Sequence, residues 1–398
     1  MSEAPAISPP PLAAGGVPAG AFARTLLVYR HRLAPASEVG FLRRFYLGFE
    51  QLRPVWLGCH LEDGAAALSR ETLRLGRTGP WGAVERTLFR HCGVLPPRPD
   101  LRALRPVLLH AHFGRGGALA LPIARALEIP LVVTYHGADA SKERHYRRHL
   151  LPPVYQRRLT ALQEEAALFV CVSEAVRERL LARGFPAEKL AVIHQGIELD
   201  MGVAPSPPAW PEPYVLFVGR FTEKKGVSDL IAAMRLLQRQ GGEVGLVLIG
   251  DGPLGGRLRH EAKDLRHVVF AGWRSSAEVR LAMRHAAAVC VPSVTAPDGD
   301  AEGLPSVVLE AMAAAAAVVA TGHAGIGEAI EHGENGLLVP EGDPPALMTA
   351  LGHVIGQPAL RGRLGAAARA TADEKFNALR QSRLLEAALL RAAGKAKS

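Results

Sequence analysis

Short apolar runs alternate with longer, helix-like stretches along most of the chain. In the first half, runs rich in Val, Leu and Ile are expected to form strands at 25–29, 107–110, 131–134, 168–172 and 191–194. A second series follows at 214–218, 245–249, 268–271, 288–292, 318–321 and 336–339. Strands separated by helix-length segments are typical of parallel sheets with helices on both faces. The pattern predicts an α/β protein with two doubly wound domains and a ligand in the cleft between them.

A proline-rich segment separates the two series and sets the expected domain boundaries. Residues 205–213 are too dense in proline for a helix or strand, so we assign them to a linker. The first domain is then expected at 21–204 and the second at 214–375, with a helix at 376–398. Residues 1–20 are rich in Pro, Ala and Gly, which predicts a disordered tail without the pattern of a signal peptide.

Composition and charge narrow the class of protein. At 398 residues, 48% of them apolar and 21% charged, the chain is long enough for two substantial cores. Its formal charge of +9 favours anionic partners such as nucleotides, phospholipids or nucleic acids. The four cysteines are far apart, which indicates neither a metal site nor a disulfide framework and fits a reducing cytosol. The longest apolar stretch, 311–320, is too short to span a bilayer, so we expect a cytoplasmic protein, soluble or attached to a membrane surface.

The segment 301–313 joins a loop to an apolar, Ala-rich helical run. Glu302 lies in the loop and Glu310 inside the helix, with Gly303, Leu304 and Pro305 at the expected helix start. Free backbone N–H groups and the positive dipole end at such a start suit a phosphate. A carboxylate on each side of this site suits a molecule with hydroxyls at both ends and phosphate in the middle, such as a nucleotide sugar. Taken alone, the segment fits equally well a Glu that stabilises the helix dipole and a second, solvated Glu.

A basic glycine turn follows the expected strand 214–218. Gly219 and Arg220 open the turn, Lys225 and Gly226 close it, and a helical pattern follows. Such a turn places cations at the carboxyl end of a parallel strand, where open α/β sheets bind ligands. Arg220 can fork onto two phosphate oxygens and Lys225 can add a point charge, whereas we expect Lys224 to face solvent. The alternative is an ordinary basic surface loop.

Together these segments resemble the retaining glycosyltransferases of family 4, whose two Rossmann-like domains form the architecture called GT-B. The match covers nearly the whole C-terminal half and consists of Gly219-Arg220 with Lys225-Gly226, the turn at 249–254, the paired glutamates, and the segments 320–328 and 333–340. The N-terminal half resembles a narrower group, the exopolysaccharide enzymes of colanic acid and amylovoran type. This likeness rests on residues 36–38, 110–114 and 134–139.

The resemblance implies transfer of a sugar from a nucleoside diphosphate donor to a glycan acceptor, lipid-linked, in polysaccharide biosynthesis, with retention of configuration. The residues that it assigns to catalysis are His136 near the reacting carbon, Arg220 and Lys225 at the leaving diphosphate, and Glu302 at the sugar hydroxyls. The residues that it assigns to donor binding are Gly219, Gly272, Gly303, Leu304, Ser306, Val307 and Glu310, the last at the ribose. The residues on the acceptor side are Ser37, Glu38, His112 and Asp139. The last helix is expected to pack back on the N-terminal domain.

Several of these residues also have ordinary structural interpretations. Asp139 can orient His136, contact an acceptor hydroxyl or cap the next helix. His112 fits a satisfied loop histidine equally well, and Ser37-Glu38 fits a helix N-terminus.

The expected reaction requires no metal and no cofactor besides the donor. Double displacement needs a carboxylate close to the anomeric carbon, and neither Glu302 nor Glu310 is an obvious nucleophile. Front-face attack guided by the leaving phosphate, as proposed for the family, is therefore expected. Asp298 and Asp300 have the spacing of a metal motif but are its weakest match.

Two basic segments with interleaved aromatic residues, 81–90 and 142–158, are either solvated faces or a surface for an anionic membrane or a lipid-linked diphosphate.

Two rival functions use other parts of the sequence pattern. A GT-B phosphorylase or epimerase would share the fold, but no phosphate site or cofactor lysine is identifiable for the former. A nucleic-acid binder would use the positive charge, but the basic residues are dispersed and only 6% of residues are aromatic, so we expect no nucleic-acid partner.

Overall fold

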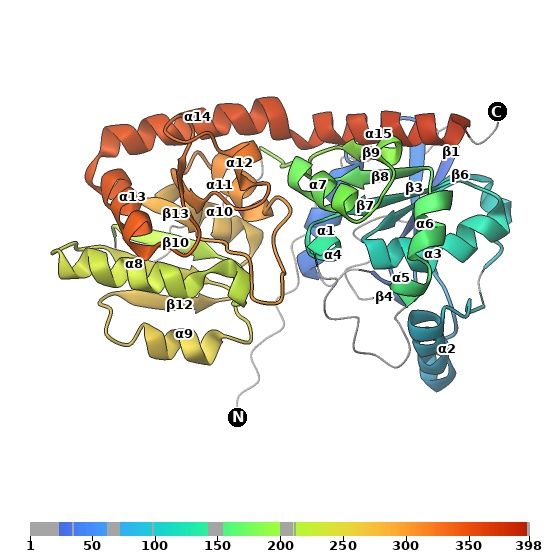
Figure 1. The fold of residues 1–398 in the computed structure, drawn as a ribbon, viewed down its shortest axis with the longest axis horizontal. Helices are drawn as coiled ribbons and strands as arrows, with labels where there is room; N and C mark the ends of the chain where they lie inside the picture. The colour runs from blue at the N-terminus through green and yellow to red at the C-terminus, as the bar shows by residue number, and fades with distance from the viewer. Residues whose placement is uncertain are drawn as a thin grey trace.

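Two α/β domains lie side by side, and one long helical segment runs across both (Figure 1). The structure, a computed structural model, describes residues 24–33, 36–61, 72–97, 99–141, 154–199, 210 and 212–395, with only the backbone at 36–39 and 395. Both main sheets are parallel, which confirms the prediction of two doubly wound domains. The tail expected at 1–20 and most of the linker expected at 205–213 lie outside the described residues.

In the described part of the N-terminal domain, seven parallel strands form a sheet in the order β5-β3-β1-β6-β7-β8-β9. The strands are β1 (Arg24–Tyr29), β3 (Leu52–Gly58), β5 (Thr72–Arg74), β6 (Pro106–His112), β7 (Leu131–Tyr135), β8 (Leu168–Cys171) and β9 (Leu190–Val192). A small ladder joins β2 (Arg32–Leu33) to β4 (His60–Leu61). The helices are α1 (Ala36–Arg43), α2 (Gly79–Cys92), α3 (Gly114–Leu127), α4 (Ala138–Ser141), α5 (Val154–Arg157), α6 (Leu159–Glu165) and α7 (Glu174–Ala182). Short 3₁₀ helices are η1 (Arg44–Tyr46), η3 (Leu101–Leu104) and η5 (Ala187–Lys189).

The C-terminal domain repeats this plan with a sheet of six described strands, in the order β12-β11-β10-β13-β14-β15. They are β10 (Tyr214–Val218), β11 (Gly245–Ile249), β12 (Val268–Gly272), β13 (Ala288–Val291), β14 (Val318–Thr321) and β15 (Leu337–Val339). The helices are α8 (Val227–Arg239), α9 (Gly255–Glu261), α10 (Ser276–His285), α11 (Ser306–Ala313), α12 (Ile326–Ala329) and α13 (Pro344–Gly356), with the 3₁₀ helix η6 (Glu223–Lys225) after β10. Strands such as β11 are buried along their whole length, because helices cover both faces of a parallel sheet.

Strand β3 has no counterpart in the expected series, and it contains Pro54, a residue that argues against a strand inside a sheet. In the structure Pro54 pairs with Leu26 of β1. On the other side of β3, the pairing with β5 begins only at Trp56. Pro54 thus lies where β3 has a described strand on one side alone, and a missing N–H is tolerated there.

The chain crosses between the domains at two adjacent points. Ile197 is hydrogen-bonded to the junction of α14 (Pro358–Phe376) and α15 (Ala378–Lys395). The Ile197 N–H donates to the Phe376 carbonyl at 2.7 Å, and the Ala378 N–H donates to the Ile197 carbonyl at 3.0 Å. Helix α14 lies over the C-terminal domain, and α15 continues over the N-terminal domain (Figure 1). Leu385 and Leu389 of α15 are buried in the N-terminal core. The last helix thus ties the end of the chain to the first domain.

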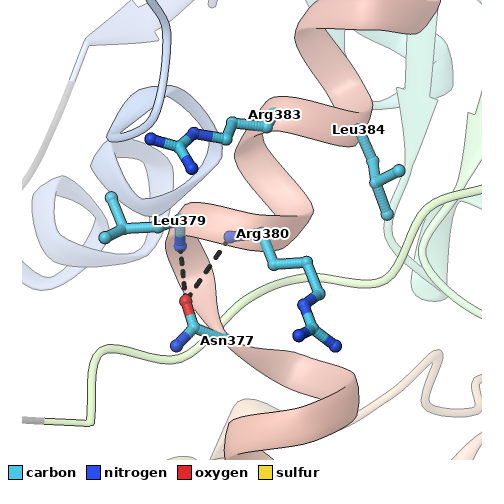
Figure 2. Close-up of a pocket in the computed structure, with 5 residues that line it drawn as sticks. All are labelled: Asn377, Leu379, Arg380, Arg383 and Leu384. Carbon is cyan, nitrogen blue, oxygen red and sulfur yellow. Dashed lines mark hydrogen bonds between the residues drawn. The ribbon is translucent and has the colours of Figure 1, made fainter.

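Asn377 separates α14 from α15 and caps the second helix. Its side-chain oxygen accepts hydrogen bonds from the N–H groups of Leu379 at 3.0 Å and Arg380 at 3.4 Å (Figure 2). A surface hollow of about 390 Å³ lies beside this cap and is lined by Asn377, Leu379, Arg380, Arg383 and Leu384. None of these five residues was predicted for the site.

Candidate active site

The loops that carry His136 and Glu302 meet where the two domains face each other. Gly137, which follows β7, has a φ of +123°, and a Cβ on it would lie 2.3 Å from the backbone nitrogen of Gly303. A Cβ on Gly303 would in turn lie 2.5 Å from the carbonyl oxygen of His136. Only glycine fits at both positions, because any side chain would separate the loops.

Two side chains of the N-terminal domain fasten this contact. Arg179 donates from Nη1 to the carbonyl oxygen of Glu302 at 2.8 Å, and Gln195 donates from Nε2 to the carbonyl oxygen of Leu304 at 2.7 Å. The structure thus brings the His136 segment of one domain against the 302–304 segment of the other.

On the C-terminal side, lysines of η6 surround the Glu302 carboxylate. Lys225 Nζ lies 3.0 Å from Glu302 Oε1, and Lys224 Nζ lies 3.4 Å from the same oxygen and 3.3 Å from Asp300 Oδ1. The expectation that Lys224 faces solvent is therefore wrong, since its side chain is only 17% exposed. Burial raises the pKa of Glu302, but the two lysines lower it further, and the net shift is downward. Glu302 is thus kept ionised.

Arg220 stands at the end of β10, on the same turn as these lysines. Its side chain is exposed, and no hydrogen bond or ion pair engages its guanidinium among the described residues. Gly219, before it, has Phe217 and the Lys225 stem within 4 Å of a Cβ position, so a larger residue would crowd the lysine. The turn therefore presents one exposed cation beside two paired ones.

His323 and Glu341 belong to the site but were not predicted for it. The backbone N–H of Glu302 donates to His323 Nε2 at 3.1 Å, so Nε2 carries no proton. The other ring nitrogen, Nδ1, then donates to Glu341 Oε1 at 2.7 Å. Glu341 also accepts from the N–H of Thr295. This chain of bonds holds the backbone of Glu302 in place from behind.

Glu310, expected at the ribose, forms an ion pair across the domain interface. Arg44 of η1 donates from Nη1 and Nη2 to Glu310 Oε1, at 3.2 and 3.3 Å. The Arg44 side chain is 10% exposed and that of Glu310 is 26% exposed. Helix α11 itself starts at Ser306 rather than at Gly303, with Pro305 as its N-cap, so Glu310 lies in its second turn.

On the N-terminal side, His136 ends a buried chain of hydrogen bonds. His136 Nε2 lies 3.1 Å from His112 Nδ1, and His112 Nε2 lies 2.7 Å from the Tyr46 hydroxyl. The same hydroxyl lies 2.8 Å from His110 Nδ1, and His110 Nε2 lies 2.7 Å from Thr134 Oγ1. His136 Nδ1 is buried and has no hydrogen-bond partner among the described residues. Because one hydroxyl serves two rings, the tautomers of all three histidines are linked.

The three histidines are held neutral. Burial lowers the pKa of His110 to about 3 and lowers the pKa values of His112 and His136 well below their ordinary range. His112, expected on the acceptor side, is completely buried, and its side chain contacts that of His136.

The remaining residues expected on the acceptor side are Asp139, Ser37 and Glu38, and the structure describes the side chain of Asp139. Asp139 accepts three backbone hydrogen bonds, from His136 and Gly137 at 2.9 and 3.0 Å through Oδ1 and from Gly114 at 3.0 Å through Oδ2. An acceptor hydroxyl would compete with these bonds, which join the ends of β6 and β7. Ser37 and Glu38 lie in the first turn of α1, and their side chains are outside the described atoms.

Gly272 ends β12 with a φ of +65°, and nothing lies within 4 Å of a Cβ position on it. Trp273, beside it, is 68% exposed. Val307 is buried and Ser306 half-buried at the start of α11. Within the described ranges, no group of three or more His, Cys, Asp or Glu side chains is placed to hold a metal ion. No described helix is both long and apolar enough to cross a membrane.

Two parallel α/β domains that join their strand ends at one site define the GT-B class. The family described as Glycosyltransferase Family 4 matches residues 55–201, and Glycosyl transferases group 1 matches residues 212–357. Anabaena HepE in complex with UDP-glucose has a similar fold, with a TM-score of 0.71 at 20% identity over 92% of this chain and 99% of that one.

Curated relatives narrow the class. The amylovoran biosynthesis glycosyltransferase AmsK of Erwinia amylovora is 37% identical over 67% of this chain and 65% of its own length. The putative colanic acid biosynthesis glycosyltransferase WcaL of Escherichia coli is 36% identical over 61% and 59%. The matches thus span about three fifths to two thirds of these relatives. A GDP-mannose-dependent phosphatidylinositol monomannoside mannosyltransferase of Mycolicibacterium smegmatis is 30% identical over 69% of this chain and 76% of its own length. The chain belongs to the family-4 glycosyltransferases.

Proposed function

We propose that this protein transfers a sugar from a nucleoside diphosphate sugar to a glycan acceptor in exopolysaccharide biosynthesis, with retention of configuration. The observation that carries the proposal is the meeting of the two loops. It sets the backbone of the half-buried His136 segment against the segment of Glu302, whose carboxylate lies beside its lysines, with the exposed Arg220 on the same turn as those lysines. Two sources outside this chain agree: the names of the amylovoran and colanic acid relatives, and the UDP-glucose bound by the structural neighbour.

In the proposed reaction, the bond between the anomeric carbon and the diphosphate oxygen breaks, and its electron pair leaves with the diphosphate. The acceptor hydroxyl attacks from the same face, and its proton passes to the departing phosphate oxygen. Arg220 and Lys225 stabilise the charge that develops on the diphosphate. Glu302, ionised, accepts hydrogen bonds from sugar hydroxyls. We assign His136 to the sugar side, where it hydrogen-bonds as a neutral ring.

No metal enters this proposal, because Arg220, Lys225 and the N–H groups at the start of α11 supply the opposing positive charge. Activity should therefore survive exhaustive chelation with EDTA. Loss of turnover in EDTA that magnesium or manganese restores would contradict this part of the proposal. It would direct attention to Asp298 and Asp300 as ligands.

We also propose that the acceptor is lipid-linked and that the N-terminal domain binds an anionic membrane from the cytoplasmic side. Helix α2 stands at one edge of that domain (Figure 1) and exposes Trp81, Val84 and Leu88 by 72, 49 and 43%. The three lie at helical spacing, so they form one apolar stripe on a helix that also carries Arg86 and Arg90. The residues 142–153 of the second basic segment lie outside the described ones. Sedimentation with anionic vesicles should fall for Trp81→Ser with Leu88→Ser, whereas equal sedimentation would contradict membrane binding by α2.

Titration with a panel of nucleotide sugars, followed by turnover with isolated glycolipid acceptors, tests the activity itself. At least one donor should bind and be consumed with transfer of its sugar and retained configuration, which NMR of the product determines. Binding of free inorganic phosphate with release of a sugar 1-phosphate from a glycan would instead indicate a phosphorylase. Failure of every nucleotide sugar to bind would contradict the proposal.

A further inference from the structure

The side chains hydrogen-bonded behind His136 carry one hydrogen more than their mutual bonds use. These side chains form the histidine chain, which consists in order of Thr134, His110, Tyr46, His112 and His136. Burial lowers the pKa of all three rings, so each is neutral near neutral pH and has one hydrogen on a ring nitrogen. Each hydroxyl brings one hydrogen as well. Five hydrogens therefore serve four hydrogen bonds, and the place of the fifth decides the tautomer of His136.

In a first arrangement, every bond of the histidine chain points towards His136. The Thr134 hydroxyl donates to His110 Nε2, and His110 Nδ1 donates to the Tyr46 oxygen. The Tyr46 hydroxyl donates to His112 Nε2, and His112 Nδ1 donates to His136 Nε2. The fifth hydrogen is then on His136 Nδ1.

Two other arrangements keep all four bonds and place the fifth hydrogen on a hydroxyl. If every bond runs the opposite way, the hydrogen of the Thr134 hydroxyl is left over. If both neighbouring rings donate to Tyr46, the hydrogen of the Tyr46 hydroxyl is left over. In both cases His136 has its hydrogen on Nε2, and Nδ1 is a bare acceptor.

The count of unsatisfied groups favours the first arrangement. Among the described residues, Thr134 Oγ1 is hydrogen-bonded to His110 alone, and the Tyr46 hydroxyl is hydrogen-bonded to the two rings alone. His136 Nδ1 is buried and has no partner in the described part of the chain. The first arrangement thus leaves one donor unsatisfied, whereas each of the others leaves one donor and one acceptor. An unsatisfied polar group in the interior is costly, so His136 should carry its hydrogen on Nδ1.

The surroundings of the His136 ring leave this N–H to a ligand. The rings of Phe41, Phe45 and Phe113 lie 5.2, 5.5 and 4.4 Å from it between centres, and phenylalanine has no lone pair that could accept a hydrogen bond. His136 is nevertheless only half-buried, and its segment lies against the 302–304 segment of the other domain. An oxygen that a substrate brings to this place would satisfy the remaining donor.

We propose that Thr134 and Tyr46 are positioning residues that hold His136 as the Nδ1–H tautomer, so that Nδ1 donates a hydrogen bond and does not accept one. The inference rests on the proposed glycosyl transfer, in which His136 hydrogen-bonds on the sugar side as a neutral ring. With this tautomer, Nδ1 bonds a lone pair of a sugar oxygen and leaves the hydrogen of a hydroxyl to another group. Thr134 and Tyr46 act through His110 and His112 and contact no substrate themselves.

NMR spectroscopy of the full chain with isotope-labelled histidine nitrogens tests the tautomer directly, without a substrate. We expect a directly bonded hydrogen on His136 Nδ1 and none on Nε2. The spectrum of His136→Gln assigns the signals by their loss. If that variant does not fold, through-space contacts between the ring and Phe41 or Phe113 assign them. A hydrogen on Nε2 alone would overturn the proposal.

A valine at position 134 should remove the preference. Thr134→Val leaves one donor and one acceptor unsatisfied whichever way the bonds run, so both tautomers of His136 are expected. Thr134→Ser keeps the hydroxyl and should restore the single Nδ1–H form. The matched control is Thr25→Val, which changes another buried threonine of the same sheet, one that accepts from Arg53 at 3.4 Å, and should leave the tautomer unchanged. A single Nδ1–H form in Thr134→Val would refute the role of Thr134.

Tyr46→Phe interrupts the histidine chain in its middle. The pair of His112 and His136 then has equal numbers of unsatisfied groups in either direction, so this variant should also show both tautomers. An unchanged single tautomer would refute the role of Tyr46.

Kinetics connect the tautomer to the reaction. When half of the molecules hold each tautomer, kcat/KM should fall about twofold against Thr25→Val, because only half are competent. Mixed tautomers with unchanged kcat/KM would overturn the link to the transfer. If no nucleotide sugar binds the wild-type protein while His136 shows the Nδ1–H form, the proposed glycosyl transfer fails and the tautomer assignment remains. If donors bind and His136 carries its hydrogen on Nε2, only the inference about the histidine chain fails.

Discussion

The two domains contribute opposite kinds of chemistry to the site. On the C-terminal side the contacts are ionic, with Lys224 and Lys225 around Glu302. On the N-terminal side His136 and His112 belong to a buried chain of neutral hydrogen-bonding groups. The pKa shifts keep this division, because the lysines keep the carboxylate ionised and burial keeps the imidazoles uncharged.

The difference suggests how the two sides divide the proposed reaction. A departing diphosphate needs fixed positive charge, which a rigid ionic cluster supplies without rearrangement. The sugar needs hydrogen-bonding groups whose protonation does not change near neutral pH. The N-terminal domain also fastens the C-terminal domain, since Arg179 holds the Glu302 carbonyl and Arg44 holds the Glu310 carboxylate. The predictions below test the two sides separately and then this connection between them.

The largest expected effect comes from removing the donor-side cations. Arg220→Ala with Lys225→Ala should lower kcat/KM by about a hundredfold or more, because the charge on the leaving diphosphate loses both partners. Steady-state kinetics with the donor found by titration measures this loss. Arg239→Ala, an exposed arginine on α8, is the control and should retain full activity. A loss below tenfold in the double variant would mean that the ionic side serves the fold and not the reaction.

Lys224 should matter chiefly for stability. Its ammonium lies near Asp300 and Glu302, both buried, so Lys224→Ala leaves two carboxylates without one of their cations. We expect the free energy of unfolding to fall by about 1–3 kcal/mol, measured by urea titration. Arg257→Ala is the matched control, because its pair with Glu223 is about half exposed and should be worth less than about 1 kcal/mol. Equal losses in the two variants would show that the ionic cluster is no tighter than a surface pair.

How far the sequence predicts this site depends on the kind of contact. Strand ends and the glycine turn could be predicted because they follow from local patterns, and the structure pairs Lys225 of that turn with Glu302. The position of the Lys224 side chain could not be predicted in this way. In η6 consecutive residues point in different directions, and the Lys224 carbonyl is bonded to Val294, which turns this lysine towards Asp300.

The sequence pattern also did not predict contacts between segments that are far apart in the chain. His323 and Glu341 are eighteen positions apart and meet only because β14 and β15 are neighbours in the sheet. His110 and His112 offered a usable signal, since residues two apart in a strand point to the same face. Their partner Tyr46 comes from η1, more than sixty positions earlier, and no local pattern indicates it.

The neutral histidines of the N-terminal domain should make the stability of the protein depend on pH. The pKa of His110 is about 3 in the folded state against an ordinary 6.5, so the unfolded chain binds the extra proton first as the pH falls. Stability that is present above pH 6.5 should therefore be lost between pH 6.5 and 3. The slope is at most about 1.4 kcal/mol per pH unit for this one group. Urea titrations at several pH values measure the slope of the unfolding free energy between pH 6.5 and 5. This range is chosen because Glu302 gains its proton only at lower pH.

The variant His110→Gln tests whether the pH dependence of stability comes from His110. It removes the titrating ring while keeping groups that can bond to Tyr46 and Thr134, so the slope between pH 6.5 and 5 should decrease. An unchanged slope would place the pH dependence elsewhere and would mean that the buried chain is not the neutral element described above.

The smallest effect is expected where the two sides meet, at the ion pair between Arg44 and Glu310. Glu310 is the proposed ribose ligand, and Arg44 engages its Oε1, so a ribose must share or displace this contact. Arg44→Ala should therefore strengthen nucleoside binding by about two- to fivefold, which is below the 1.4 kcal/mol that corresponds to a tenfold change. Arg43→Ala is the matched control, because the neighbouring Arg43 pairs with Glu198 at 3.0 Å and not with Glu310. Calorimetry with the free nucleoside isolates the ribose from the phosphate cations. Weaker binding in Arg44→Ala would show that the arginine supports the ribose site from the other domain instead of competing for it.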